Sequence, residues 1–349
     1  MTSVPPVLGL STHTLVQPAP RFCLRQTRDV DLHADSLSGW QQDYEQVSPG
    51  RFDGAVRELT TPTVQVFEEV ANRATVQSCH TWPGGLWVGM PVQEQPQGLR
   101  FFGKPVEAGE LMMAAHCQFE LQVPADLGLY GVVIDTQALQ RHARLLHHAD
   151  WQAPDWSTPR TQAITPLQRW RLAGLVREVL TGLQLNPAAL HHEASCRSLQ
   201  QALLTVVAES LQPEQAAPVL STRTHRRHQL VDKAKAILLA QPDQPVDVAT
   251  LCAELHVTRR TLQNCFQDVM GISPATYLRT LRLNAVRRAL RDAAPDDPHT
   301  VADIAARWGF WHMGHFSHDY THLFGENPSV TRLRPREALT LTTGDGGLH

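Results

Sequence analysis

Residues 307–329 read RWGFWHMGHFSHDYTHLFGENPS, and this stretch decides the fold of the C-terminal part of the chain. Its aromatic residues Phe316, Tyr320 and Phe324 recur every four positions, which places them on one face of an α-helix. Gly309 precedes them where a turn is needed, and glycine adopts a positive φ at little cost. Because Ile304 lies on a further helical stretch, the sequence predicts a helix, a turn and a second helix.

The same pattern occurs once more, earlier in the chain. In the first copy, five hydrophobic, glycine and proline residues are separated by intervals of 11, 4, 5 and 3 positions: Leu251, Leu262, Phe266, Gly271 and Pro274. Those of the second copy follow at intervals of 12, 4, 5 and 3: Ile304, Phe316, Tyr320, Gly325 and Pro328. One extra residue in the turn is the only difference in spacing. An internal repeat of two helix-turn-helix units is therefore predicted.

A helix from Ser273-Pro274 to about Asp292 is predicted between the two copies. Twenty helical residues span roughly 30 Å, and successive major-groove segments on one side of B-DNA are about 34 Å apart. The helix is rich in arginine and has the length needed to hold two helices in successive grooves.

This duplicated arrangement resembles the AraC/XylS family of bacterial transcription regulators. The second copy carries that family's pattern of Ile-Ala, Gly-Phe, a Phe, an aromatic residue and Gly-x-x-Pro. The matching positions are Ile304-Ala305, Gly309-Phe310, Phe316, Tyr320, Gly325 and Pro328. The resemblance implies a cytoplasmic, homodimeric protein that binds promoter DNA and RNA polymerase and has a cupin-like effector domain.

The outward faces of the second helices supply the candidate DNA contacts. Arginine can read guanine, and asparagine or glutamine can read adenine, which favours base contacts by the first unit. Glycine and histidine suit phosphate contact or shape readout by the second unit. The candidates for direct contact are Arg259, Arg260, Gln263, Asn264, Gln267, Met313, Gly314, Ser317, His318 and Thr321. The candidates for phosphate contact are Thr258, Arg282 and Arg287.

Three alternatives compete with this interpretation. The polar residues could form only a solvated surface. His318 and His322 are four residues apart and could bind zinc, but no third ligand lies in a suitable pattern, so no metal site is expected. An enzyme with a DNA-binding tail would need a catalytic constellation, a P-loop or a dinucleotide fingerprint, and none is evident.

The segment before the repeat differs in charge and in periodicity. Residues 223–336 hold 16 Lys and Arg against 11 Asp and Glu, whereas the rest of the chain holds 15 against 23. Up to about residue 40 the chain is proline-rich and aperiodic, and from there to Asp135 it reads as short strands separated by turns. Helical patterns follow. An α+β fold is expected, with an effector-binding and dimerisation domain at 1–211, a linker at 212–229, the double helix-turn-helix domain at 230–336 and a disordered tail at 337–349.

The effector is expected to be a small metabolite. Segments such as WQQDYEQVSPGRFDG and LYGVVIDTQALQRHARLLHHAD are similar to regulators of ethanolamine-utilization operons. That similarity implies ethanolamine as effector, with adenosylcobalamin as a possible co-effector and no tightly bound cofactor. The alternative is a regulator of the same family for another catabolic operon. An ammonium group could lie over an indole beside a carboxylate, which makes Glu68, Trp82, Trp87 and Glu120 candidates. Asp31-x-His33 matches a base-off cobalamin motif only in part, because Ser36 stands where glycine is usual.

The cellular location is expected to be the cytoplasm. No run of apolar residues is long enough to cross a membrane, and no basic flank precedes an apolar stretch at the N-terminus. The six cysteines are scattered, without the paired spacing of a zinc site or a disulfide framework.

Overall fold

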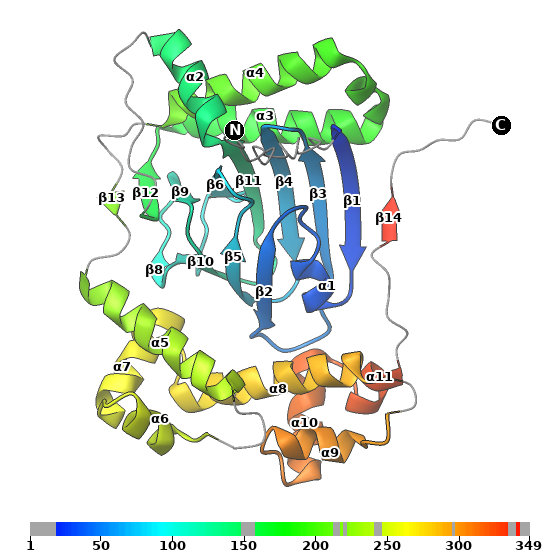
Figure 1. Ribbon diagram of the computed structural model, residues 1–349, viewed down its shortest axis with the longest axis vertical. Helices are drawn as coiled ribbons and strands as arrows, with labels where there is room; N and C mark the ends of the chain where they lie inside the picture. The colour runs from blue at the N-terminus through cyan, green and yellow to red at the C-terminus, as the bar shows by residue number, and fades with distance from the viewer. Residues whose placement is uncertain are drawn as a thin grey trace, which may run out of the picture.

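The computed structural model describes residues 19–147, 158–211, 217–218, 222–240, 246–294, 297–333 and 340–342. A β-rich region lies in the middle of the molecule, with one group of helices at one end and the C-terminal helices at the other (Figure 1). Among the described helices, none is long and apolar enough to cross a membrane.

The β-rich region contains two packed sheets. Among the described residues, nine strands form sheet A in the order β13-β12-β9-β6-β11-β4-β3-β1-β14, and five form sheet B in the order β2-β5-β10-β7-β8. The strands of sheet A are β1 (Arg21–Thr27), β3 (Gly54–Thr60), β4 (Val64–Ala71), β6 (Gly85–Pro91), β9 (Glu110–Ala115), β11 (Gly128–Asp135), β12 (Arg160–Ala163), β13 (Ala217–Pro218) and β14 (Thr340–Thr342). The strands of sheet B are β2 (Gln41–Gln46), β5 (Thr75–His80), β7 (Arg100–Phe101), β8 (Lys104–Pro105) and β10 (Phe119–Val123).

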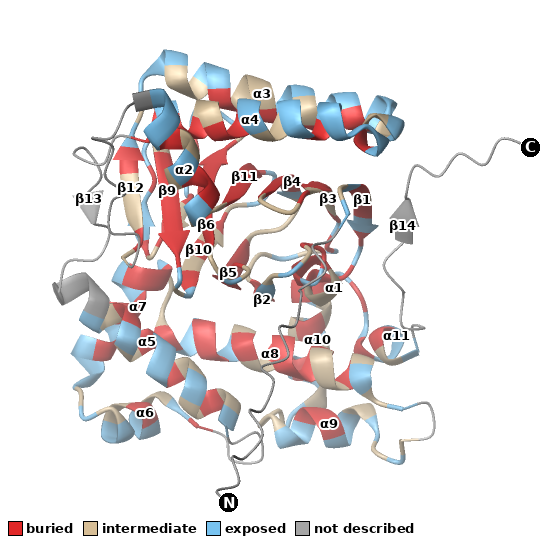
Figure 2. Ribbon diagram, turned by 45° about the horizontal axis from the view of Figure 1, so that its top comes forward, coloured by how far each residue is buried: buried red, intermediate tan, exposed pale blue. Residues whose placement is uncertain are grey.

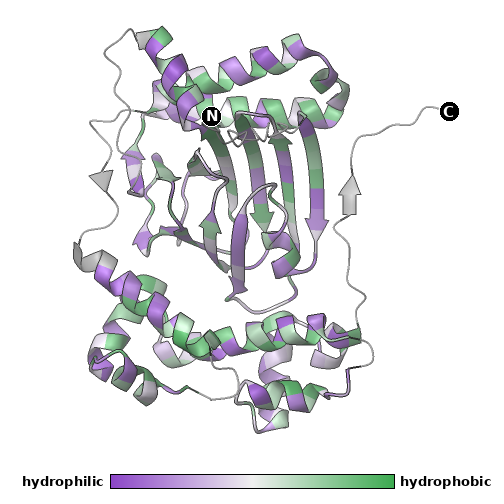
Figure 3. Ribbon diagram, in the orientation of Figure 1, coloured by the Kyte–Doolittle hydropathy of each residue, from purple (hydrophilic) through white to green (hydrophobic). Residues whose placement is uncertain are grey.

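Alternation along the strands of sheet A builds two cores. In β4, Val64 and Val66 belong to the core shared with helices, whereas Phe67 belongs to the core between the sheets. The helices of the first core are α2 (Thr136–His147), α3 (Pro166–Leu185), the 3-10 helix η1 (Pro187–His191) and α4 (Glu193–Ser210). Figure 2 shows long runs of buried residues in β9 and β11. β2, with the sequence QQDYEQ, is a mainly hydrophilic strand at an edge of sheet B (Figure 3).

The C-terminal helices form the predicted pair of helix-turn-helix units. The first unit contains α6 (Val248–Glu254) and α7 (Arg259–Met270), and the second contains α9 (Val301–Arg307) and α10 (Met313–Phe324). They lie at opposite ends of α8 (Pro274–Asp292), as Figure 1 shows. α5 (Thr222–Ala240) precedes the first unit and α11 (Pro328–Leu333) follows the second, while α1 (Val30–Ala34) lies far away in sequence, between β1 and β2.

The turns of the two units share a left-handed residue at the same position of the repeat. Gly309 has a φ of 80° in the second unit, and His256 has a φ of 54° in the first. Both second helices end on a left-handed glycine, Gly271 with a φ of 71° and Gly325 with a φ of 66°. The repeat seen in the sequence is therefore also a repeat of backbone conformation.

Three predicted boundaries differ from the structure. Residues 19–40, expected to be aperiodic, contain β1 and α1, because β1 pairs along its whole length with β3. The predicted linker 212–229 is too long, because its last eight residues belong to α5, where Val231, Ala234 and Leu238 enter the core of the first unit. Within the predicted disordered tail, Thr340–Thr342 pairs with β1, and the other tail residues lie outside the described ones.

Candidate nucleic-acid interface

The first unit presents a polar face on α7. Leu262, Cys265 and Phe266 are buried on its inner side. Thr258 is the N-cap, and its hydroxyl accepts a hydrogen bond from Thr261 N at 3.1 Å. Every predicted direct-contact residue of this helix is exposed, namely Arg259, Arg260, Gln263, Asn264 and Gln267. These five side chains, which carry hydrogen-bond donors and acceptors, thus point away from the protein core.

The second unit presents a less open face on α10. Phe316, Tyr320 and Phe324 are buried, as the aromatic spacing predicted. The predicted contacts Gly314 and His318 are exposed, whereas Met313, Ser317 and Thr321 are half-buried. The Thr321 hydroxyl also donates to Asn327 Oδ1 at 3.0 Å.

The histidines of α10 do not form a metal site with other described residues. His318 and His322 stack with ring centroids 6.4 Å apart. No group of three or more His, Cys, Asp or Glu residues with metal-binding geometry occurs in the described part of the chain. The nearby Asp319 forms an ion pair with Arg279 of α8.

Arg287 is not available for phosphate contact, so that prediction is wrong. Its side chain is 5% exposed, and it lies 2.5 Å from Asp29 Oδ2 and 2.8 Å from Asp31 Oδ2. Burial would raise the pKa of Asp29, but Arg287 and Arg291 together with the Leu32 amide hold it below the usual value. The arginine therefore faces the β-rich region.

Arg282 is intermediate in burial between the exposed side chains of α7 and the buried Arg287. It is half-buried and donates to the backbone oxygen of Val246, ahead of α6. Burial lowers the pKa of its guanidinium, against the opposing charge of Asp247. To contact a phosphate as predicted, the Arg282 guanidinium would have to bind the phosphate in addition to the Val246 oxygen.

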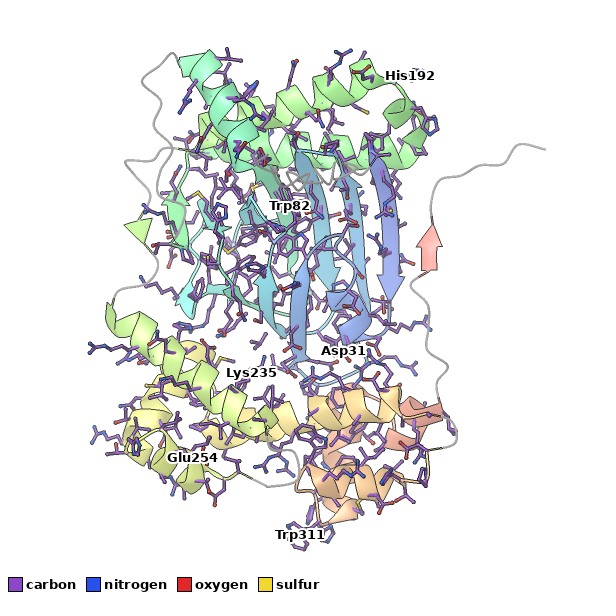
Figure 4. All side chains as sticks on the ribbon, in the orientation of Figure 1. Asp31, Trp82, His192, Lys235, Glu254 and Trp311 are labelled. Atoms are coloured by element: carbon purple, nitrogen blue, oxygen red, sulfur yellow. The ribbon has the colours of Figure 1, made fainter. Side chains whose placement is uncertain are left out.

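The polar stripe of α8 docks on the β-rich region through what we call the α8 ion-pair cluster. Arg288 lies 2.9 Å from Glu45 Oε1 and 3.3 Å from Asp43 Oδ1, and Arg291 lies 2.8 Å from Asp29 Oδ1. Figure 4 shows Asp31 on the side of the β-rich region that faces α8. The members of the cluster are Asp29, Asp31, Asp43, Glu45, Lys235, Arg287, Arg288 and Arg291.

Sequence reasoning missed this cluster, although a signal was present. Asn284, Arg287, Arg288 and Arg291 recur at intervals of three, one and three residues and so form one stripe of a helix. Asn284 joins the same contact, because its Nδ2 donates to Gln46 O at 3.1 Å and its Oδ1 accepts from Gln46 N at 3.2 Å. A stripe of polar residues on a buried face indicates a docked surface.

The β-rich region also reaches the C-terminal ends of α7 and α10. Gln122 of β10 donates to the backbone oxygen of Val269 in α7. Gln46 Nε2 and Gly50 N donate to Leu323 O in α10 at 2.6 and 3.0 Å. Carbonyl groups that a helix end leaves unpaired are thus satisfied by another part of the chain.

Comparison with known proteins identifies the double unit. Residues 251–334 match the family described as "Helix-turn-helix domain". The chain is 37% identical over 100 residues to the probable thc operon regulatory protein of Rhodococcus erythropolis, and 30% identical over 197 residues to the HTH-type transcriptional activator RhaR of Pectobacterium atrosepticum. The C-terminal part of the chain is therefore a helix-turn-helix domain similar to those of these regulators.

The curated relatives match this chain only in part. The two alignments cover 29% and 55% of this chain, and 30% and 65% of the respective relatives. The XylDLEGF operon transcriptional activator of Pseudomonas putida is 36% identical over 72 residues, which cover 21% of this chain and 22% of the relative. The chain therefore spans less than two thirds of each of these relatives. All three are described as regulatory proteins or transcriptional activators.

The four predicted effector residues do not share one site. Glu68 lies on the helix-facing side of β4, where it forms an ion pair with Arg57, and Arg57 donates to Gln184 of α3 at 3.2 Å. Glu120 lies on the opposite side of the β-rich region, on the face of sheet B that meets the helix-turn-helix domain. Strand alternation thus separates the two carboxylates.

The two tryptophans lie between these surfaces. Trp87 is 2% exposed and stacks on Phe119 with ring centroids 4.4 Å apart, inside the core between the sheets. Trp82 is half-buried and donates to Gln65 Oε1 at 3.0 Å (Figure 4). The predicted site, an indole with a carboxylate nearby, is therefore not formed by Trp87 and Glu68, which lie on opposite faces of sheet A.

The partial cobalamin motif does not fit that cofactor. His33 is 1% exposed, with Nε2 3.0 Å from Glu69 Oε1 and its ring against Phe52. Asp31 belongs to the α8 ion-pair cluster. Both residues of Asp31-x-His33 are thus occupied by contacts within the protein, and a histidine in this position cannot reach a large corrinoid.

Proposed function

We propose that the protein is a sequence-specific DNA-binding regulator that activates transcription in response to a small metabolite. The observation that carries this proposal is the pair of matched units, whose second helices expose polar faces at the two ends of one 19-residue helix. At about 1.5 Å per residue, α8 spans roughly 28 Å, close to the separation of successive major-groove segments. Activation is supported by the relatives that are described as transcriptional activators.

The two units are assigned different parts in reading DNA. α7 carries arginine, asparagine and glutamine, whose side chains can bond bidentately to guanine or adenine. α10 carries glycine, serine and histidine, which suit backbone contact. Thr258 and Arg282 stay proposed phosphate contacts, and Arg287 is withdrawn from the set.

Replacement of two residues of α7 tests this assignment. An operator is selected from a random duplex library, and its affinity is measured by fluorescence anisotropy. In the double variant Arg260→Ala, Asn264→Ala, binding should weaken by about 1–3 kcal/mol per lost base contact, with relaxed selectivity at the contacted positions. Arg141→Ala, at an exposed position of α2, is the control for the loss of a positive charge. An unchanged affinity and an unchanged selected motif would refute the role of α7.

The proposed effector is ethanolamine, bound by a cupin-like β-rich domain in a homodimer that recruits RNA polymerase. This part rests on the similarity to regulators of ethanolamine-utilization operons and on the two-sheet architecture. No step is assigned to adenosylcobalamin, because Asp31 and His33 do not fit it. Calorimetry of the full chain with ethanolamine should show saturable heat at millimolar ligand, and its absence would favour a different metabolite.

A further inference from the structure

A cavity of about 880 Å³ lies where the β-rich region meets α5. Strands β5 and β10 and the β7–β8 turn form one side, and α5 forms the other. Its lining includes Val76, Phe102, Phe119, Glu120, Asp232 and Lys235. Lys235 marks this boundary in Figure 4. Any occupant would therefore touch both the β-rich region and the segment that leads into the helix-turn-helix domain.

The aromatic side of the cavity is held in place by its surroundings. Phe102 and Gly103 both have positive φ, 48° and 66°, and join β7 to β8 in a tight turn. A Cβ on Gly103 would lie 2.9 Å from the Val269 backbone, so this turn fits closely against the end of α7. Val76 of β5 lies on the same face of sheet B as Glu120, because it pairs with Gln122 of β10. Such pre-formed apolar walls with a few polar groups are typical of small-molecule sites.

The charges that face the cavity favour a cationic occupant. Three carboxylates line it, those of Asp43, Glu120 and Asp232, against one lysine, Lys235. The Lys235 ammonium lies 3.2 Å from Asp43 Oδ2 and 3.9 Å from Glu45 Oε1, so its charge is already balanced. An anionic ligand would have to displace these contacts and approach the remaining carboxylates.

Glu120 provides the specific acceptor. Its Oε1 atom is shielded from solvent and has no hydrogen-bond partner among the described residues. A buried carboxylate oxygen without a partner is costly, and an N–H donor from a ligand would satisfy it.

We propose that this cavity binds a small alkylammonium ion, with Glu120 accepting a hydrogen bond from the ammonium group and Phe102 and Val76 contacting the alkyl part. The inference rests on the proposed function only in taking this ion to be the effector. Binding at the boundary would stabilise the docked arrangement of α5 on sheet B, which couples ligand occupancy to the position of the first unit.

The pH dependence of binding follows from the groups around Glu120. Burial raises its pKa to about 7, and Asp232 adds to this, whereas Lys235 and a hydrogen bond with Gln122 oppose it. Asp43 from β2, His228 from α5 and the Tyr277 ring from α8 also lie near this carboxylate or line its cavity. Because the cation binds the ionised carboxylate, affinity should rise between about pH 6 and about pH 8.

Calorimetry of the full chain with ethylammonium, ethanolamine and tetramethylammonium tests the proposal, with propionate as the anionic control. At least one of the cations should bind and propionate should not. Glu120→Gln should weaken binding by about tenfold or more and flatten the pH profile, and Asp232→Asn should also weaken it. Glu94→Gln, at an exposed position away from the cavity, should leave it unchanged.

Several outcomes would overturn the proposal. These are the absence of binding by all three cations, binding of propionate instead, or equal affinity in a folded Glu120→Gln variant. Operator binding is measured on the same preparations. Loss of cation binding with intact operator binding would remove only the cavity assignment, whereas cation binding without operator binding would remove only the proposed function.

Discussion

The two helix-turn-helix units share one spacing but meet the β-rich region in different ways. The core of the first unit includes Val76 of β5, so part of its contact is apolar. The core of the second unit contains no residue of the β-rich region among those described, and its contact includes ion pairs and hydrogen bonds. The same local pattern thus builds the same unit, while long-range contacts give each unit its own role.

The largest expected effect distinguishes two arginines of α8. Arg287→Ala should lower the free energy of unfolding by about 3–5 kcal/mol, because the buried carboxylates of Asp29 and Asp31 lose their closest cation. Arg282→Ala, nearer the first unit, should cost about 1 kcal/mol, because it removes one half-buried hydrogen bond to a backbone oxygen. Urea unfolding followed by circular dichroism measures both. Similar losses would show that docking of the second unit does not depend on the ion pairs.

An intermediate effect is expected at the glycines that end α7 and α10. Gly271→Ala should cost about 1 kcal/mol, since its φ is positive but no atom lies within 4 Å of the added Cβ. Gly325→Ala should cost about 2–3 kcal/mol, because its Cβ would also lie 2.6 Å from Arg51 N in the β-rich region. Thermal unfolding of the two variants gives the difference. Equal losses of stability would mean that the backbone at Arg51 moves to accommodate the added Cβ without strain.

The units could be predicted from the sequence because their signals are local. Phe316, Tyr320 and Gly309 lie within a dozen residues of one another, and α8 begins and ends where its N-cap and apolar spacing predicted. The exposure of Arg260 and Asn264 follows from the same helical periodicity. The spacing of hydrophobic residues, together with the N-cap, therefore predicted both the helices and their exposed faces.

The docking of the two regions could not be predicted in this way. Arg287 and Asp29 are 258 residues apart, and no periodicity connects them. The effector residues could not be placed together for a related reason. Alternation along a strand shows which side chains share a face, but it does not show which neighbouring element that face meets. Glu68 and Glu120 therefore looked equivalent in sequence, although sheet pairing places them on opposite sides of the β-rich region.

The smallest expected effect concerns two buried tyrosines, one in each unit. The Tyr320 hydroxyl donates to Thr331 Oγ1 at 2.8 Å, and Thr331 in turn donates to Glu326 Oε1 at 2.7 Å. Tyr320→Phe should therefore cost about 1 kcal/mol of unfolding free energy. Tyr277 of α8 is equally buried in the core of the first unit, where its ring contacts Phe266. Because Tyr277→Phe keeps this ring contact, it should change stability by less than about 0.5 kcal/mol. Chemical denaturation of both variants measures the difference in unfolding free energy. A larger loss of stability for Tyr277→Phe than for Tyr320→Phe would contradict the view that buried polar contacts matter more in the second unit.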